Sequence, residues 1–329
     1  MSVPVRVRSA LAVLVVAMLA LTGCAAASAD PTGATRTVVD AEGTSVEVPA
    51  HPQRVVTLSE PTLDGVLALG VTPVGTVSGR GQSTVPNYLS DVAGDLPILG
   101  SISEPNYEAI GAVSPDLILV DGTSVNNNPP VIEALRQIAP VVYTGYAGGD
   151  WRDNFTLVAE ALGLTDEGAQ VIADYDTRVT EAAAQLGAYA DDTFSIVRWQ
   201  GGSASVILEE LPPGQALEDL GLARPASQDR IGRGHSEPVS NENLTDIDAD
   251  YMFFGTLGGS SVDNPDAGGS AGVADAETAL ADAEAVPGFT ELNAYVHGHI
   301  IPVDGSAWTS TGGPLLMNRI VDDVVEALA

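Results

Sequence analysis

Hydrophobic residues along the chain follow two patterns, one typical of buried strands and one typical of surface helices. Short apolar runs at Val55–Leu58, Leu117–Val120 and Tyr251–Phe254 have the length and composition of buried strands. Segments with apolar residues three or four positions apart, such as 151–162 and 314–328, predict amphipathic helices between and after them. Strands that alternate with helices in this way favour an α/β fold with parallel sheets covered by helices.

The longest helical pattern covers residues 166–187, which places a helix of about 33 Å near the middle of the chain. Much of its surface is polar, so we expect it to lie across two lobes and not inside one. The strand and helix pattern runs up to this helix and then restarts after it. Further strands are predicted at 37–39, 45–48, 73–77, 98–99, 141–143, 193–199 and 300–303, and further helices at 62–69, 129–139 and 214–220.

Two stretches on either side of the long helix repeat the same order of residues. In 107–120 and in 241–254, a glutamate (Glu108, Glu242) opens a short helix, and an aspartate eight positions on precedes a buried strand. The repeat predicts equivalent units in two similar lobes.

The first 23 residues are typical of an export signal. A basic start is followed by an apolar run, 10–21, that is short for a membrane span. It ends at Leu21-Thr22-Gly23-Cys24, which resembles the lipobox of bacterial lipoproteins, and Cys24 is the one cysteine of the chain. We expect a lipid on Cys24, a linker over 24–35 and a location on the outer face of the cytoplasmic membrane. The alternative is a plain secretory signal with an incidental cysteine.

The composition restricts the partners. The formal net charge is −31, and all 13 basic residues are arginine. Such a surface repels nucleic acid and anionic lipid. An anionic ligand would need arginines grouped at one place.

Five segments, taken together and in order, carry a family resemblance: 54–56, 69–75, 108–120, 220–225 and 242–254. They resemble the periplasmic-binding-protein family that serves iron–siderophore and cobalamin importers. The resemblance implies two Rossmann-like α/β lobes with parallel-rich sheets, joined by a single long rigid helix, with the ligand in the cleft between them. The lobes would be 36–165 and 188–329, and the helix 166–187.

Arginines at strand ends are the first candidates for ligand contact, because ligands of open α/β sheets sit beyond the carboxyl ends of the strands. Arg80 follows the strand at 73–77, and Arg198 and Trp199 end the strand at 193–199. Arg233, between two glycines, is a third arginine candidate. Guanidinium groups suit the oxygens of a ferric siderophore. The alternative for each is a surface salt bridge.

Aromatic residues are the second group of candidates. Tyr146 follows the strand at 141–143, and Trp308 precedes the closing helix, so either could form a wall of the cleft or pack in the core. We interpret Trp151 as a core residue, and Arg54 and Arg224 as parts of the scaffold.

Metal and enzyme sites find little support in the sequence. His297 and His299 occupy a predicted turn, and Asp246, Asp248 and Asp250 lack the glycine that a calcium loop requires, since Tyr251 stands there. Nucleophile-elbow and phosphate-loop motifs are missing. We therefore expect no metal site, no cofactor and no catalysis, although a serine hydrolase using His235 stays open, as does a purely structural lipoprotein.

The resemblance implies a solute-binding lipoprotein that captures a ferric siderophore and delivers it to the permease dimer of an ABC importer with its ATPase. Glu108 and Glu242 match the family's permease-docking glutamates. Binding of a corrinoid or haem is the alternative within the family.

Overall fold

The computed structural model describes residues 33–124, 128–146, 148–234, 236–259 and 270–329. The expected leader, Cys24, most of the linker, and His235 lie outside these residues. By its contacts the chain divides into residues 1–34 and 35–329, and the fold below is that of 35–329. Among the described residues, no helix combines the length and apolarity that crossing a membrane requires.

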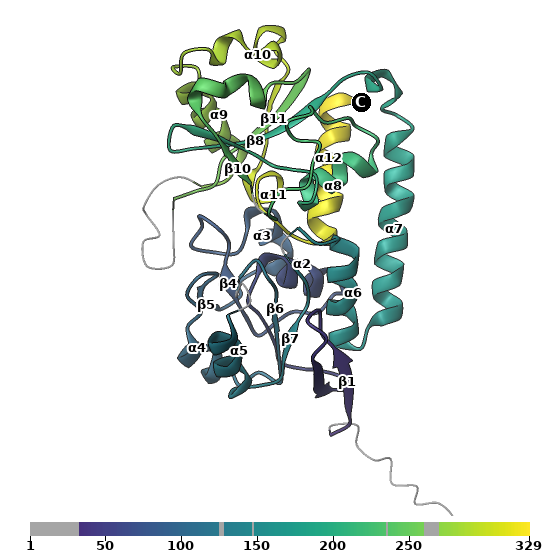
Figure 1. Ribbon diagram of the computed structural model, residues 1–329. Helices are drawn as coiled ribbons and strands as arrows, with labels where there is room; N and C mark the ends of the chain where they lie inside the picture. The colour runs from purple at the N-terminus through teal and green to yellow at the C-terminus, as the bar shows by residue number, and fades with distance from the viewer. Residues whose placement is uncertain (1–32, 125–127, 147, 235, 260–269) are drawn as a thin grey trace, which may run out of the picture. The chain divides into compact units, whose positions relative to one another are not determined.

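The N-terminal lobe is built on a parallel sheet with the strand order β5-β4-β3-β6-β7 (Figure 1). An antiparallel hairpin, β1 with β2, precedes it. The strands are β1 Thr35–Val39, β2 Ser45–Pro49, β3 Val55–Thr57, β4 Gly75–Ser78, β5 Ile98–Ser101, β6 Leu117–Val120 and β7 Val141–Tyr143. The helices are α2 Glu60–Ala68, η1 Asn87–Leu89, α3 Ser90–Ala93, α4 Tyr107–Ala112, α5 Pro129–Arg136 and α6 Trp151–Leu162. Every strand predicted in this half is present within a few residues.

The C-terminal lobe is built on a mixed sheet with the order β10-β9-β8-β11-β12. Strands β8, β11 and β12 are parallel, whereas β9 and β10 add an antiparallel edge that the sequence pattern did not predict. The strands are β8 Phe194–Gln200, β9 Ser203–Val206, β10 Glu237–Val239, β11 Tyr251–Gly255 and β12 Ile300–Pro302. The helices are α8 Pro212–Asp219, η3 Asn241–Ile247, α9 Val273–Ala283, η4 Phe289–Glu291, α10 Asn293–His297, α11 Gly305–Trp308 and α12 Pro314–Leu328.

The repeated aspartates, Asp116 and Asp250, accept equivalent backbone hydrogen bonds in the two lobes. Asp116 precedes β6, and its carboxylate accepts hydrogen bonds from the N–H groups of Gln53 and Arg54, at 2.8 and 2.9 Å, where the chain enters β3. Asp250 precedes β11 and accepts a 2.9 Å bond from the N–H of Thr193, where the chain enters β8. Each aspartate thus ties together two neighbouring parallel strands, β3 with β6 or β8 with β11.

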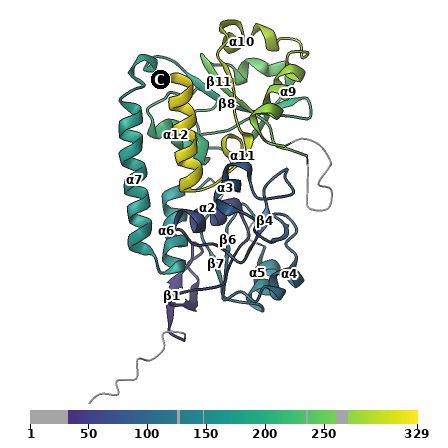
Figure 2. The same cartoon turned by 180° about the vertical axis from the view of Figure 1, so that it is seen from behind.

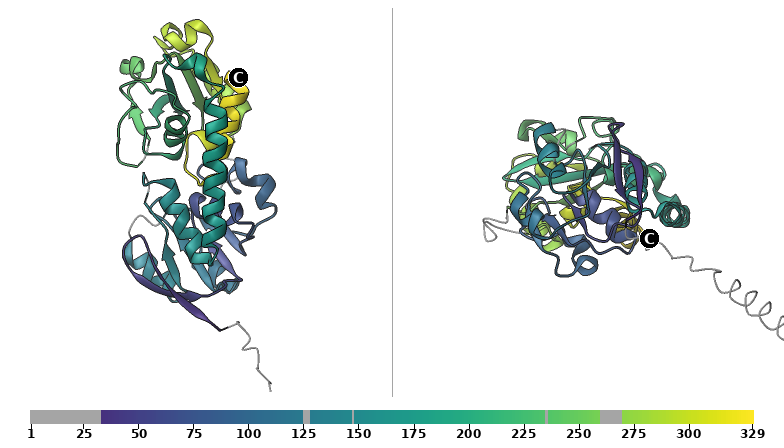
Figure 3. Two further views of the ribbon diagram at one scale, coloured as in Figure 1. Left: turned by 90° about the vertical axis from the view of Figure 1, so that its right-hand side faces the viewer. Right: turned by 90° about the horizontal axis from the view of Figure 1, so that it is seen from below.

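The long helix α7 (Thr165–Ala183) leads from the first lobe to the second and runs alongside both (Figures 1 and 2). It ends four residues before the predicted stop at Gly187, which instead opens the 3-10 turn η2 (Gly187–Tyr189). The reason is Leu186, which is 3% exposed and packs in the core, so the chain leaves the helix axis to bury it. Figure 3 shows α7 from its exposed side.

One hydrophobic cluster continues from one lobe into the other. It contains Leu117 of β6, Val66 of α2, Phe194 of β8 and Leu316 of α12. Helix α12 packs against α2 as well as against α7 and α8, so it bridges the lobes beside the long helix. Because a wide hinge motion would expose this shared core to water, the two lobes are held by apolar burial as well as by the connecting helix.

Asp64 fastens α12 to α2. Its carboxylate is fully buried and accepts hydrogen bonds of 2.9 Å from the N–H groups of Leu315 and Leu316, in the first turn of α12. The hydroxyl of Tyr88 donates a third bond, also 2.9 Å. A carboxylate at this position satisfies backbone donors that the helix leaves unpaired and is favoured by the helix dipole.

Asp64 is expected to make folding stability depend on pH. Burial raises the pKa of its carboxyl from 3.8 to about 6, against the opposing effect of the hydrogen bonds it accepts. Because the pKa is higher in the folded state, the protonated Asp64 carboxyl contributes to folding stability. This contribution is fully present below the unfolded pKa of 3.8 and is lost as the pH rises through about 6, a change of ~3 kcal/mol in the free energy of unfolding. Urea unfolding of the wild type and Asp64→Asn at several pH values measures it. The wild type should lose stability relative to the variant as pH rises, and parallel profiles would contradict the assignment.

Candidate functional site

A cavity of about 300 Å³ lies where the two lobes face each other. It is lined by Arg80 and Thr123 from the N-terminal lobe, Leu211, Gly234, Ser236 and Arg198 from the C-terminal lobe, and Thr309, Ser310 and Thr311 from the connection between α11 and α12. A second hollow of about 450 Å³ shares Arg80 and Thr123 with it and extends along Ser78–Gln82, Ser101–Ser103 and Ser124. Both hollows lie at the carboxyl ends of parallel strands, where ligands of α/β folds bind.

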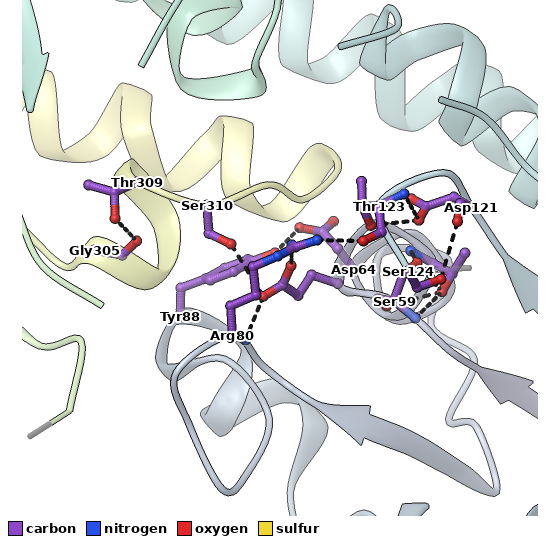
Figure 4. A network of polar contacts seen from close by, with 12 residues as sticks. Ser59, Asp64, Arg80, Tyr88, Asp121, Thr123, Ser124, Gly305, Thr309 and Ser310 are labelled. Atoms are coloured by element: carbon purple, nitrogen blue, oxygen red, sulfur yellow. Dashed lines mark hydrogen bonds and ion pairs between the residues drawn. The ribbon is translucent and has the colours of Figure 1, made fainter. Parts of the chain in front are cut away.

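Arg80 is held in place by a carboxylate that the sequence pattern did not predict. Glu60, the first residue of α2, forms an ion pair with the Arg80 guanidinium and accepts a 2.9 Å bond from its backbone N–H. The other end of the guanidinium donates to the carbonyl oxygen of Thr123 at 2.7 Å. Figure 4 shows Arg80 between Ser310 and Thr123. The arrangement fixes Arg80 at the boundary shared by the two hollows.

Arg198 has a different environment. It lies on β8, is partly buried, and donates to the carbonyl oxygen of Thr309 at 3.3 Å and to the hydroxyl of Ser236. Burial, and then the nearby charge of Arg80, lower the pKa of its guanidinium, which nevertheless stays protonated at neutral pH. Within the described part of the chain, no carboxylate pairs with it. A guanidinium with only neutral partners at the wall of a cavity favours an anionic ligand.

Hydroxyl groups form much of the remaining wall. Thr309, Ser310 and Thr311 stand together just before Gly312 and Gly313. Ser310 donates to Glu60 at 3.2 Å, and Thr309 donates to the carbonyl oxygen of Gly305 at 2.9 Å. A run of Ser and Thr between a strand and a closing helix is the sequence signal that could have identified this wall.

Backbone contacts between glycines bring the lobes together beside the cavity. Gly81 has a φ of 67°, and a Cβ atom there would collide with the carbonyl oxygen of Gly258 in the other lobe. Gly148 has a φ of 76°, and its Cβ would come within 2.8 Å of the Cα of Gly234. Because Gly81 lines the second hollow and Gly234 lines the cavity, both contacts border the site.

Two of the aromatic candidates, Trp199 and Trp308, are buried and do not line the cavity. Trp199 is 2% exposed and packs against Phe254 and Phe289, because neighbouring residues of a strand face opposite sides of the sheet and Arg198 takes the cavity side. Its edge borders a different hollow of about 500 Å³. Trp308 is fully buried, stacks on Phe253 with 4.1 Å between ring centroids, and donates to Asp323.

The other candidates lie at the surface near the site. Tyr146 is 43% exposed, and its hydroxyl donates to the carbonyl oxygen of Ala41 at 3.2 Å, so its ring lies along the outside of the N-terminal lobe. Arg233 is exposed, and its neighbour Gly234 lines the cavity in its place. Of the six predicted ligand contacts, Arg80 and Arg198 are the ones that the structure brings to the cavity.

The residues interpreted as scaffold are confirmed. Arg224 is 8% exposed and donates to the carbonyl oxygens of Phe194 and Ile207, and burial lowers its pKa to about 10. Arg54 donates to the carbonyl oxygens of Val113 and Ser114. Trp151 is 1% exposed.

The histidine pair and the acidic groups do not gather into a metal site in the described ranges. His299 stacks on Tyr251 with 4.2 Å between ring centroids, and its Nδ1 lies 2.9 Å from the carbonyl oxygen of Asp250. Among the residues that the structure describes, no group of three or more His, Cys, Asp or Glu side chains could hold a metal ion.

Glu108 and Glu242 occupy matching places in the two lobes. Glu108 is exposed in the first turn of α4, which Asn106 caps, and Glu242 is exposed in the first turn of η3, which Ser240 caps. Each precedes the strand that follows the repeated aspartate. Neither lines the cavity or the adjoining hollow.

Comparison with known proteins agrees with this geometry. A family model described as periplasmic binding protein matches residues 55–307. The probable siderophore-binding lipoprotein YfiY of Bacillus subtilis (strain 168) is 32% identical over 326 residues, which cover 96% of each chain. The Fe(3+)-citrate-binding protein YfmC of the same organism is 26% identical over 96% of this chain and 95% of its own.

Solved structures show the same fold. Staphylococcus aureus SirA complexed with staphyloferrin B is similar with a TM-score of 0.73 and 25% identity, over 89% of this chain and 98% of SirA. Bacillus subtilis FeuA complexed with ferri-bacillibactin gives a TM-score of 0.71 at 22% identity, over 89% of this chain and 98% of FeuA. With the family model matching most of its length, the chain belongs to the periplasmic binding protein family.

Proposed function

We propose that this protein captures an anionic ferric siderophore in the cavity between its lobes and delivers it to the membrane permease of an ABC importer. The observation that carries the proposal is Arg198, a partly buried guanidinium at the cavity wall whose described partners are all neutral. A carboxylate or another anionic oxygen of the ligand would complete its hydrogen bonds and balance its charge.

The walls suit a hydrated, oxygen-rich ligand. The hydroxyl-bearing residues Thr123, Ser236 and Ser310 line the same cavity as Arg80 and Arg198. The cavity and the adjoining hollow, about 300 and 450 Å³, lie in the size range of small-molecule sites. Relatives named for siderophore or Fe(3+)-citrate binding support this ligand class.

A corrinoid or haem is the alternative ligand, and the walls give it little support. Large macrocycles with apolar faces are bound by aromatic and aliphatic side chains. The described lining residues of the two hollows include no aromatic ring, and the apolar side chains among them are Leu211 and Ile102. Binding without chemical change of the ligand is the function we propose.

Delivery rests on Glu108 and Glu242. Both are exposed, both stand in the first turn of a capped helix, and each belongs to a different lobe. We propose that they dock into basic sites on the two halves of a permease dimer whose transport is driven by an ATPase. A lipid on Cys24 would hold the protein on the outer face of the cytoplasmic membrane, with 24–35 as a linker between the anchor and the first lobe, 36–165.

Replacing Arg198 with alanine is expected to weaken ferric-siderophore binding by about 1.5–3 kcal/mol, the cost of a lost hydrogen bond to a charged group. Tryptophan fluorescence titration of the purified protein with ferric chelates measures the dissociation constant, which should rise about ten- to a hundredfold. Arg178→Ala is the matched control, because it removes the same charge from α7, where Arg178 pairs with Asp322. Equal dissociation constants for wild type and Arg198→Ala would remove Arg198 from the site.

A further inference from the structure

Glu60 places a buried carboxylate at the cavity. It opens α2 directly after the capping residue Ser59, and it is 3% exposed. One carboxylate oxygen accepts from the backbone N–H of Arg80 at 2.9 Å and from the hydroxyl of Ser310 at 3.2 Å, while the other pairs with the Arg80 guanidinium. Glu60 therefore contacts an arginine and a hydroxyl that both line the cavity.

The two cavity arginines consequently differ in how far a neighbouring carboxylate balances their positive charge. Arg80 is neutralised by its ion pair with Glu60, whereas Arg198 contacts a carbonyl oxygen and a hydroxyl. A ligand therefore meets one guanidinium whose charge is balanced and one whose charge is not, within the ranges that the structure describes.

Other carboxylates around the site act in the same direction. Asp121, 1% exposed, lies behind Thr123 and accepts from its N–H and hydroxyl at 3.0 and 2.6 Å. Glu210, 7% exposed, accepts from the N–H groups of Gly232 and Gly234 at 2.9 and 3.0 Å on the other side. Together with a formal net charge of −31 on the whole chain, these carboxylates disfavour a strongly negative ligand.

We propose that Glu60 is a specificity-determining residue that sets the charge of the ligand: by neutralising Arg80 it makes the site favour ferric chelates of low negative charge. The inference rests on the proposed function. Ferric chelates differ in this property, since tris-hydroxamate complexes are neutral, complexes with one or two carboxylate groups carry a small negative charge, and tris-catecholate complexes are triply negative. The site would take the carboxylate-bearing class, with a ligand carboxylate on Arg198.

The test compares wild type with Glu60→Gln, which keeps the size of the side chain and its acceptor oxygen but removes the charge. Isothermal titration uses three probes: a neutral ferric tris-hydroxamate, a singly negative ferric citrate-type chelate that binds iron through two hydroxamates and one α-hydroxycarboxylate, and a triply negative ferric tris-catecholate. It gives three dissociation constants for each protein. Wild type should bind the citrate-type chelate most tightly. In Glu60→Gln the affinity for the tris-catecholate, relative to that for the tris-hydroxamate, should rise about tenfold or more, because Arg80 then acts on the ligand with its full charge.

The ratio of affinities separates a charge effect from a packing effect. Glu181→Gln is the control, because it removes the same charge from an exposed position on α7, away from the cavity, and it should leave the ratio unchanged. If Glu60→Gln changes the affinities for all three chelates by the same factor, or if wild type prefers the tris-catecholate, the inference is overturned while the proposed function stands. If wild type binds no ferric chelate, the proposed function fails and the inference fails with it.

Discussion

Simultaneous replacement of Glu108 and Glu242 by alanine is expected to abolish import of the ferric chelate while leaving its affinity for the purified protein unchanged. Both side chains are exposed in the first turn of a helix, and neither lines the cavity. If each docks into a basic site on the permease, the double variant loses two charge-assisted contacts together. Uptake of radioactive iron by cells that depend on this protein measures import, and titration of the purified variant measures binding.

The control for this experiment removes two other exposed acids, Glu181 of α7 and Glu277 of α9. That variant has the same net charge as the Glu108/Glu242 double variant, so a general electrostatic effect on the membrane surface would appear in both. Wild-type uptake by the Glu108/Glu242 variant, at a normal protein level, would rule out the docking role.

The second large effect concerns stability. Trp308→Ala is expected to reduce the free energy of unfolding by about 3–5 kcal/mol, the usual cost of removing a large buried aromatic side chain. The Trp308 ring is fully buried against Phe253, and its Nε1 donates to Asp323 at 2.8 Å. Urea unfolding measures the loss.

Trp308→Phe separates the two contributions of this residue. It keeps much of the ring packing and loses the hydrogen bond to Asp323, so a loss of about 1 kcal/mol is expected. A Trp308→Ala protein that unfolds like the wild type but binds ferric chelates poorly would return Trp308 to the ligand site and contradict its place in the core.

The sequence predicted the parts of the fold that depend on local pattern. Buried parallel strands such as β6 read as continuous apolar runs, and α12 has both of its predicted ends. Strands β9 and β10 were missed because Ser203–Val206 is short and half polar and Glu237–Val239 contains a proline, which is tolerated at a sheet edge. The repeat between the lobes could be recognised in the sequence because Asp116 and Asp250 stand at equivalent positions and accept equivalent hydrogen bonds from backbone N–H groups.

The site was predictable where topology alone decides it. Arg80 and Arg198 reach the cavity because they stand at the carboxyl ends of strands. The alternation of side chains along a strand would also have excluded Trp199 from the cavity, because it follows Arg198 on β8 and therefore points to the opposite face of the sheet. Glu60 could not be found in this way, because its partners Arg80 and Ser310 are 20 and 250 residues away, after β4 and in the α11–α12 connection, and only the complete fold brings both to the start of α2.

Direct calorimetric titration of the purified protein tests whether the cavity between the lobes holds an anionic ferric chelate. We expect saturable one-to-one binding of a carboxylate-bearing ferric chelate, with weaker binding to Arg198→Ala and unchanged binding to Arg178→Ala. Absence of saturable binding for every ferric chelate class, or tight binding that Arg198→Ala leaves intact, would contradict it.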